Sequence, residues 1–274
     1  MARDLPPSSP MPGTRMTTRR HRARAHAAKG FGHLLGAARR PLGWLARQEA
    51  LVLVTAFFIV LAIYGFIELA TEIREGELRD FDEWFLRLLR RDIDPALPIG
   101  PAWLPPMMMD ITALGGVTIL ALVTLVAAGY LVLMQRYGAT ALVVVASLGG
   151  GLLSEVLKRE FGRARPVVVP HLIVVQSLSF PSGHSMAAAV IYLTLGALLA
   201  RFTARRRIRI YVLGISFGLT FLIGITRVYL GVHYPTDVLG GWAAGLAWAL
   251  ACWLVARYLQ YRGAVEAPGR STPR

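Results

Sequence analysis

Cysteine is almost absent from this sequence, and acidic residues are scarce. Cys252 is the only cysteine among 274 residues, so neither an intrachain disulfide framework nor a cysteine-ligated metal site is possible. Asp and Glu together number 16 against 30 Lys and Arg, which gives a formal net charge of +14. This large positive excess therefore needs an explanation.

A basic excess is typical of proteins that bind nucleic acid, but the positions of the charges here favour a membrane protein. Residues 1–50 contain ten Lys or Arg against two acids, whereas residues 72–112 contain five arginines against nine acids. Five further arginines fall within residues 201–209. Basic clusters beside some apolar runs and not others are what the positive-inside rule produces. We therefore expect membrane lipids, and no nucleic acid, as partners.

Long apolar runs occupy most of the remaining chain, which is 55% hydrophobic. About 20 apolar residues in a helix span the hydrocarbon core of a bilayer. Spanning helices are predicted at 50–71, 113–134, 139–158, 184–202, 208–228 and 237–259. The predicted fold class is all-α, a six-transmembrane-helix bundle. The expected organisation is a basic, disordered cytosolic tail over 1–48, the membrane domain over 49–260, and a short cytosolic tail over 261–274.

The basic segments also predict the orientation of the bundle. Placing the N-terminal tail and the arginines of 201–209 in the cytosol puts both termini on that side. Three segments then lie on the outer face, 72–112, 159–183 and 229–236. The first contains an amphipathic stretch, Phe81 to Arg90, which we expect to lie along the membrane interface. The prolines that follow it are expected to break it before the second spanning helix.

Ionisable residues that the positive-inside rule does not explain lie at the outer ends of the predicted helices. They are Lys158 and Arg165 after the third helix, His184 at the start of the fourth, Arg227 at the end of the fifth, and His233 and Asp237 beside the sixth. Such groups are costly in or near a bilayer and mark functional sites. Four helix ends on one membrane face therefore predict an outer-face active site.

Three cations in this group indicate an anionic ligand. Lys158, Arg165 and Arg227 can converge, and guanidinium groups match phosphate oxygens bidentately. A lone lysine at a helix end would ordinarily reach toward the headgroups, but the two arginines in corresponding positions favour a phosphate site. Arg159 and Arg163 are interpreted as contacts to lipid headgroups.

Two shorter patterns admit both a structural and a functional interpretation. Ser182 can cap the fourth helix, while the free amide of Gly183 at the helix start can bind an anion. Asp237 can be the N-cap of the last helix, or it can hold the His233 imidazole so that the far nitrogen acts as nucleophile or base. The presence of Arg227 six residues before His233 favours the functional interpretation.

These residues resemble the three-part signature of the type-2 phosphatidate phosphatase superfamily. The parts are Lys158 with Arg165-Pro166, then Pro181-Ser182-Gly183-His184, then Arg227 with His233 and Asp237. Thr226 stands where the family usually has serine, and it retains the hydroxyl group. The resemblance covers residues 158–237 for the signature and about 50–259 for the membrane frame.

The resemblance implies specific roles. His233 is expected to be the nucleophile that forms a phosphohistidine, Asp237 to orient it, and His184 to protonate the leaving lipid oxygen. The phosphate oxygens are expected to bind Lys158, Arg165, Ser182, the Gly183 amide and Arg227. His171, in the outer loop, is expected to be structural or to line the substrate. No cofactor is implied, and a site with one carboxylate and several cations does not suit a hard metal ion.

The predicted function is metal-independent hydrolysis of a lipid phosphate monoester or diphosphate at the outer face of a bacterial inner membrane. Candidate substrates are undecaprenyl diphosphate, phosphatidate and phosphatidylglycerol phosphate. Two alternatives remain open. A phosphotransferase would pass the phosphoryl group from the same histidine to an alcohol, and a transporter or scaffold would carry a site without catalytic activity.

Overall fold

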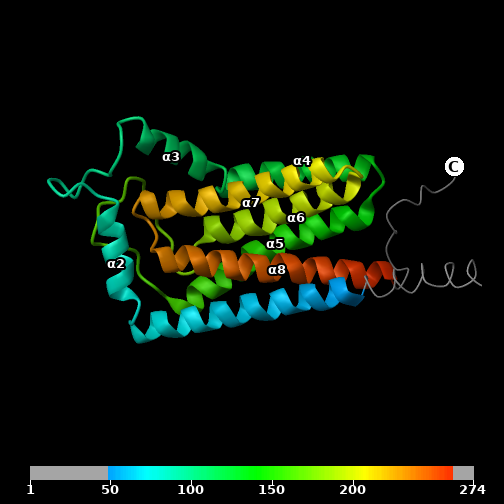
Figure 1. Cartoon of the computed structure of the whole chain (residues 1–274), viewed down its shortest axis with the longest axis horizontal. Coiled ribbons are helices and arrows are strands. Elements are labelled where there is room, and N and C mark those ends of the chain that lie inside the picture. The colour runs from blue at the N-terminus through cyan, green and yellow to red at the C-terminus, as the bar shows by residue number, and fades with distance from the viewer. Residues whose placement is uncertain (1–48, 262–274) are drawn as a thin grey trace, which may run out of the picture. The chain divides into compact units, whose positions relative to one another are not determined.

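The computed structural model describes residues 49–261, and this part of the chain is helical. The helices are Glu49–Glu75, α2 (Arg79–Leu88), α3 (Leu104–Ala113), α4 (Val117–Leu133), α5 (Tyr137–Phe161), α6 (Gly183–Phe202), α7 (Arg206–Tyr229) and α8 (Pro235–Tyr261). Within residues 49–261 the only β pairing is an isolated bridge between Arg90 and Pro98. The predicted all-α fold is confirmed. Of the two compact units of the chain, Met1–Val54 and Thr55–Arg274, the second contains α2 to α8 (Figure 1).

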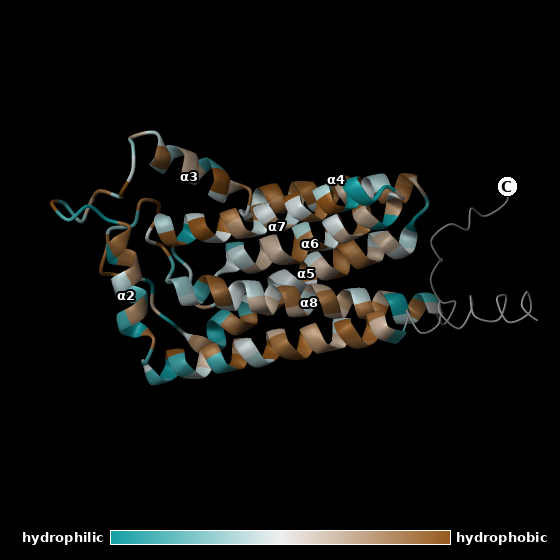
Figure 2. Cartoon of the chain, in the orientation of Figure 1, coloured by the Kyte–Doolittle hydropathy of each residue, from teal (hydrophilic) through white to brown (hydrophobic). Residues whose placement is uncertain are grey.

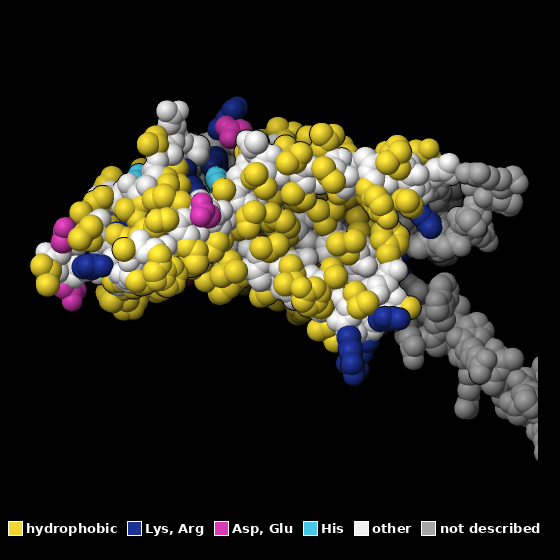
Figure 3. Space-filling view, turned by 90° about the horizontal axis from the view of Figure 1, so that it is seen from above, with side chains coloured by type: hydrophobic (Ala, Val, Ile, Leu, Met, Phe, Trp, Pro, Cys, Tyr) yellow, Lys and Arg dark blue, Asp and Glu magenta, His cyan; other side chains and the backbone are white. Residues whose placement is uncertain are grey.

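Five of these helices are long and apolar enough to cross a membrane. They are Glu49–Glu75, α5, α6, α7 and α8. A sixth span exists if α3 and α4, which meet at an angle of 45°, are counted as one. Hydrophobic side chains dominate the long helices (Figure 2), and they cover the middle of the face shown in Figure 3. The predicted N-terminal tail, 1–48, lies outside the described residues, and so does the predicted C-terminal tail apart from residue 261.

Helix α3 was not predicted: the sequence indicates only that prolines break the amphipathic stretch before the second spanning helix, which was expected to begin at residue 113. The structure places Pro105 and Pro106 in the first turn of α3. Proline is tolerated in that turn because its missing N–H would have no helical partner. Proline therefore permits α3 to begin at this point, while α2 has already ended at Leu88, before the first proline of this segment at Pro95.

The turns between helices bring four helix ends to one end of the bundle. Helix α6 packs against α5, α7 and α8, so the end of α5, the start of α6, the end of α7 and the start of α8 are neighbours. The backbones approach closely at Gly241 of α8, where a Cβ atom would lie 2.7 Å from the Ser182 carbonyl oxygen. The turn between α6 and α7, with its arginines, lies at the opposite end (Figure 1).

Helix α2 has both a buried and an exposed apolar stripe. Leu86 is fully buried and packs with Val169 and Tyr234, against which Phe85 and Leu89 also pack. A second stripe is exposed and consists of Phe81, Trp84 and Leu88. The helix expected between Phe81 and Arg90 is therefore present, attached to the end of the bundle where the four helix ends meet.

Candidate active site

Lys158, Arg165 and the start of α6 meet at this end. The Lys158 ammonium donates to the Ser177 hydroxyl at 3.0 Å, and Arg165 Nη2 donates to the same oxygen at 3.0 Å. A Cβ atom at Gly183 would lie 3.4 Å from Lys158 Nζ. The two cations and the helix start are thus adjacent, although 25 residues separate Lys158 from Gly183 in sequence (183 minus 158).

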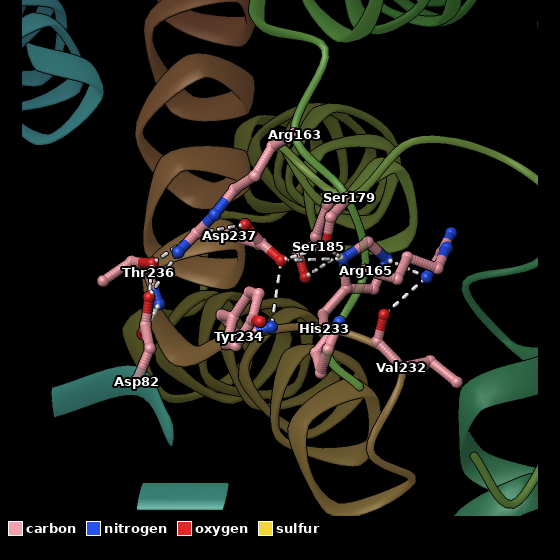
Figure 4. A network of polar contacts seen from close by, with 12 residues as sticks. Asp82, Arg163, Arg165, Ser179, Ser185, Val232, His233, Tyr234, Thr236 and Asp237 are labelled. Atoms are coloured by element: carbon pink, nitrogen blue, oxygen red, sulfur yellow. Dashed lines mark hydrogen bonds and ion pairs between the residues drawn. The ribbon is translucent and has the colours of Figure 1, made fainter. Parts of the chain in front are cut away.

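His233 lies in the turn between α7 and α8, between an acid and an arginine. Its side chain is 1% exposed, and Nδ1 lies 3.3 Å from Asp237 Oδ2. Arg165 Nη1 lies 3.2 Å from Nε2 on the other edge of the ring and also donates to the Val232 carbonyl at 2.5 Å (Figure 4). An Nδ1–H group that donates to the carboxylate leaves the Nε2 lone pair facing Arg165.

Asp237 is fully buried in the first turn of α8, so it is not the N-cap of that helix. Besides His233, its Oδ2 atom accepts from the Tyr234 amide at 2.9 Å and from the Ser179 hydroxyl. Its Oδ1 atom accepts from Arg163 Nη1 at 2.7 Å. A buried carboxylate with this many donors keeps its charge and its orientation, and its alternative assignment as a helix cap is wrong.

Arg163 does not face the lipid headgroups, and that expectation is wrong. Its side chain is 14% exposed, and its two terminal nitrogens each lie 2.7 Å from a buried carboxylate, Asp237 on one side and Asp82 on the other. Gly162, in the left-handed conformation, ends α5 and lets the chain turn there. Arg159, by contrast, has a side chain 77% exposed and pairs with Glu155 on the surface of α5.

Arg227 and Ser182 complete the buried polar groups that the sequence predicted. Arg227 is 2% exposed and donates from Nη1 to the Thr112 hydroxyl at 3.1 Å. Its Nε atom is buried and has no hydrogen-bond partner among the described residues, so it remains available to an oxygen ligand. Ser182 precedes α6 without making a side-chain cap bond, and its amide donates to the Asp237 carbonyl at 2.9 Å.

His184 lies in the first turn of α6, beside the break between α3 and α4. A Cβ atom at Gly115 would lie 3.4 Å from His184 Cδ2, and one at Gly116 would lie 3.9 Å from its Nε2. The groups that act electrostatically on His184 are Arg227, His233, Lys158 and Arg165. Figure 3 shows Lys or Arg and His side chains together in a hollow between apolar surfaces. The structure therefore brings all eight predicted residues to one end of the bundle.

Burial and charge set the protonation of the loop residues. Burial lowers the pKa of His233 to about 4, against the opposing effect of its hydrogen bond to Asp237. His233 is therefore neutral at pH 7, as a nucleophile must be. Burial also lowers the pKa of Arg165. For Arg163, burial acts in the same direction, but the charges of Asp237 and Asp82 outweigh it and the pKa is raised.

Four contacting residues were not singled out from the sequence. They are Asp82, Thr112, Ser177 and Ser179. Asp82 did leave a signal, because it falls on the buried stripe of α2 with Phe85, Leu86 and Leu89 at helical spacing. The serines and the threonine left none, since hydroxyl residues are common in outer loops and helices. Among residues 49–261, no group of three or more His, Cys, Asp or Glu side chains could hold a metal ion.

Comparisons with known proteins agree with this arrangement. Residues 139–261, which include every predicted site residue, match the model of the PAP2 superfamily. Phosphatidylglycerophosphatase B of Bacillus subtilis (strain 168) is 35% identical over 185 residues, which cover 66% of this chain and 86% of that protein. A lipid A 1-phosphatase of Rhizobium etli is 33% identical over 104 residues, 35% of this chain and 40% of that protein.

A solved structure extends the similarity to the fold. The crystal structure of a transmembrane PAP2 type phosphatidylglycerolphosphate phosphatase from Bacillus subtilis superimposes with a TM-score of 0.65 and 30% sequence identity. The aligned region covers 77% of this chain and 98% of that one. The similarity therefore extends to the arrangement of the membrane helices.

Proposed function

Since this chain belongs to the PAP2 superfamily and is an integral membrane lipid phosphatase, we propose that it acts through a phosphohistidine at His233. The observation that carries the proposal is the position of the His233 ring between Asp237 and Arg165. A phosphate bound by Arg165 would lie against Nε2, and the carboxylate would hold the opposite nitrogen. This geometry suits in-line attack on phosphorus.

The first step forms a bond between His233 Nε2 and phosphorus and breaks the bond between phosphorus and the lipid oxygen. His184 gives its proton to that oxygen, so the lipid leaves as an alcohol or, from a diphosphate, as a phosphate monoester. Lys158, Arg165 and Arg227 neutralise the charge on the equatorial oxygens. Asp237 stabilises the positive charge that develops on the His233 ring.

The second step returns the enzyme to its starting state. Water attacks phosphorus, the bond to His233 Nε2 breaks, and inorganic phosphate is released. His184, which has lost its proton in the first step, accepts one from the water. The backbone amide of Gly183, at the start of α6, is placed to bind the phosphate oxygens through both steps.

We infer that the substrate is a lipid phosphate of the cell envelope. Phosphatidylglycerol phosphate is supported by the names of the Bacillus subtilis relative and of the similar structure. Undecaprenyl diphosphate and phosphatidate present the same terminal phosphate. The arginines between α6 and α7, at the end opposite the site, support a cytosolic position for that turn and a site on the outer face of the bacterial inner membrane.

Phosphate release from purified lipids tests this function. The protein in detergent, with EDTA present, is expected to release phosphate from at least one of phosphatidylglycerol phosphate, phosphatidate and undecaprenyl diphosphate. Vanadate should inhibit. His233→Ala should lower kcat by at least about a thousandfold because it removes the nucleophile. His171→Ala, which removes an exposed histidine of the outer loop, is the matched control and should retain activity.

Two results would contradict the proposal. Loss of activity in EDTA with recovery in magnesium would indicate a metal-dependent reaction instead. Full activity in His233→Ala would show that His233 is not the nucleophile.

A further inference from the structure

Asp82 is a fully buried carboxylate on α2, whereas Arg79 and Arg87 of the same helix are exposed and pair with the partly buried Glu83. Its Oδ2 atom accepts from Arg163 Nη2 at 2.7 Å and from the Thr236 hydroxyl at 2.5 Å. Its Oδ1 atom accepts from the Thr236 amide at 3.2 Å. Burying a carboxylate is costly unless charge and hydrogen bonds compensate. Its position therefore calls for an explanation beyond helix packing.

Arg163 connects this carboxylate to Asp237, the carboxylate proposed to orient His233. One terminal nitrogen of its guanidinium contacts Asp82, while the other donates to Asp237 at 2.7 Å and to Thr236 at 2.8 Å (Figure 4). A planar guanidinium fixes the relative positions of the groups at its two ends. Asp82 thus sets where Arg163 lies, and Arg163 sets where one oxygen of Asp237 lies. The other oxygen of Asp237 contacts His233.

The segment that follows α2 directly is attached to the same region by a second polar residue. Arg90 is 4% exposed and donates to the carbonyl oxygens of Tyr229 at 3.0 Å and Pro170 at 3.4 Å. The positive φ of Gly231, +76°, and its missing side chain make room, because a Cβ atom there would lie 2.5 Å from Arg90 Nη2. Helix α2 is therefore fixed to the turn that carries His233.

We propose that Asp82 and Arg163 are positioning residues that hold the Asp237 carboxylate against the His233 ring. Neither contacts the phosphate; Asp82 acts through Arg163, and Arg163 acts through Asp237. Helix α2 thereby serves the reaction from outside the signature segment, since Asp82 lies 76 residues before Lys158 (158 minus 82). This inference rests on the proposed function of His233 and Asp237.

The test is the kinetics of Asp82→Asn, which preserves the shape of the side chain but removes its charge. We expect kcat to fall about tenfold to a hundredfold, the usual effect of losing an outer partner of a site residue, with KM for the lipid unchanged because the phosphate cations remain. Asp80→Asn is the matched control: it makes the same chemical change at an exposed acid of the same helix and should keep the wild-type kcat.

A kinetic double-mutant cycle identifies the route. If Asp82 acts through Arg163, Asp82→Asn should add little to the loss already caused by Arg163→Lys, whose single ammonium cannot span both carboxylates. If the double variant instead lowers kcat by the product of the two single effects, Asp82 does not act through Arg163. If Asp82→Asn does not yield folded protein, the kcat of Arg163→Lys tests the inference instead. A wild-type kcat in Arg163→Lys would overturn it.

The outcomes also separate this inference from the function on which it depends. Absence of phosphate release by the wild-type protein, or full activity in His233→Ala, would contradict the proposed function. An active wild type, an inactive His233→Ala and an unaltered kcat in folded Asp82→Asn would leave the function standing and contradict only the positioning role.

Discussion

Arginines occur at both ends of the helix bundle, but the two groups lie in different environments. At the end where α5 and α7 terminate, Arg163 and Arg227 are largely or fully buried, and their terminal nitrogens contact side chains of other elements. At the opposite end, Arg205 in the turn between α6 and α7 and Arg207 at the start of α7 are exposed. Arg209, also near the start of α7, donates only to nearby backbone carbonyls, those of Ala200 and Thr203.

The difference shows that residue type and net charge do not by themselves indicate function. An exposed arginine near a membrane surface is inexpensive and serves orientation in the bilayer. A buried arginine has lost its hydration and must regain that free energy from fixed partners or from a ligand. Burial with an unpaired donor, as at Arg227 Nε, therefore distinguishes the end that we propose binds phosphate. Substitutions at the two ends should differ greatly in effect.

The largest expected difference concerns Arg227. Arg227→Gln should lower kcat/KM about a hundredfold to a thousandfold, because a preorganised buried charge on the phosphate oxygens is lost. Most of the loss should fall on kcat if the contact strengthens in the transition state. Steady-state phosphate release, corrected for the amount of folded protein by size-exclusion chromatography, measures it. A loss smaller than about threefold would mean that Arg227 only supports the fold.

The sequence was sufficient to predict the spanning helices, and to predict which polar residues gather at one end of the bundle, because both leave local signals. Apolar runs have a length set by the bilayer, and Lys158, His184 and Asp237 occur in short patterns at helix ends. Arg163 was misassigned because its partners, Asp82 and Asp237, lie 81 and 74 residues away in sequence. Such contacts depend on how helices pack, and no local pattern records them. Helix α3 was missed because proline has opposite effects at the start and in the interior of a helix.

The response to pH should also be set at the site end of the bundle, because His233 must be neutral to attack phosphorus. Burial lowers the pKa of His233 to about 4, so kcat/KM should stay level as pH falls from 7 to 5 and drop about tenfold per unit below 4.

A pH series of initial rates, on a lipid whose own ionisation is corrected for, would measure this acid limb. His184→Gln should keep the acid limb, which belongs to His233, at a much lower rate. An acid limb centred near 6.5, the usual pKa of histidine, would show that His233 is not protected from protonation by burial.

The smallest expected effect is that of Arg207→Gln, the same chemical change as Arg227→Gln made at the start of α7, next to the α6–α7 turn. Arg207 is exposed, so a neutral side chain there loses no buried contact. Exposed charges contribute about 1 kcal/mol or less to the free energy of unfolding. The remaining arginines of the turn maintain the positive charge that orients the helices. We expect kcat/KM within twofold of wild type and an unchanged yield in membranes. A loss comparable to that of Arg227→Gln would mean that the turn takes part in catalysis, and burial would then fail as the criterion that separates the two groups of arginines.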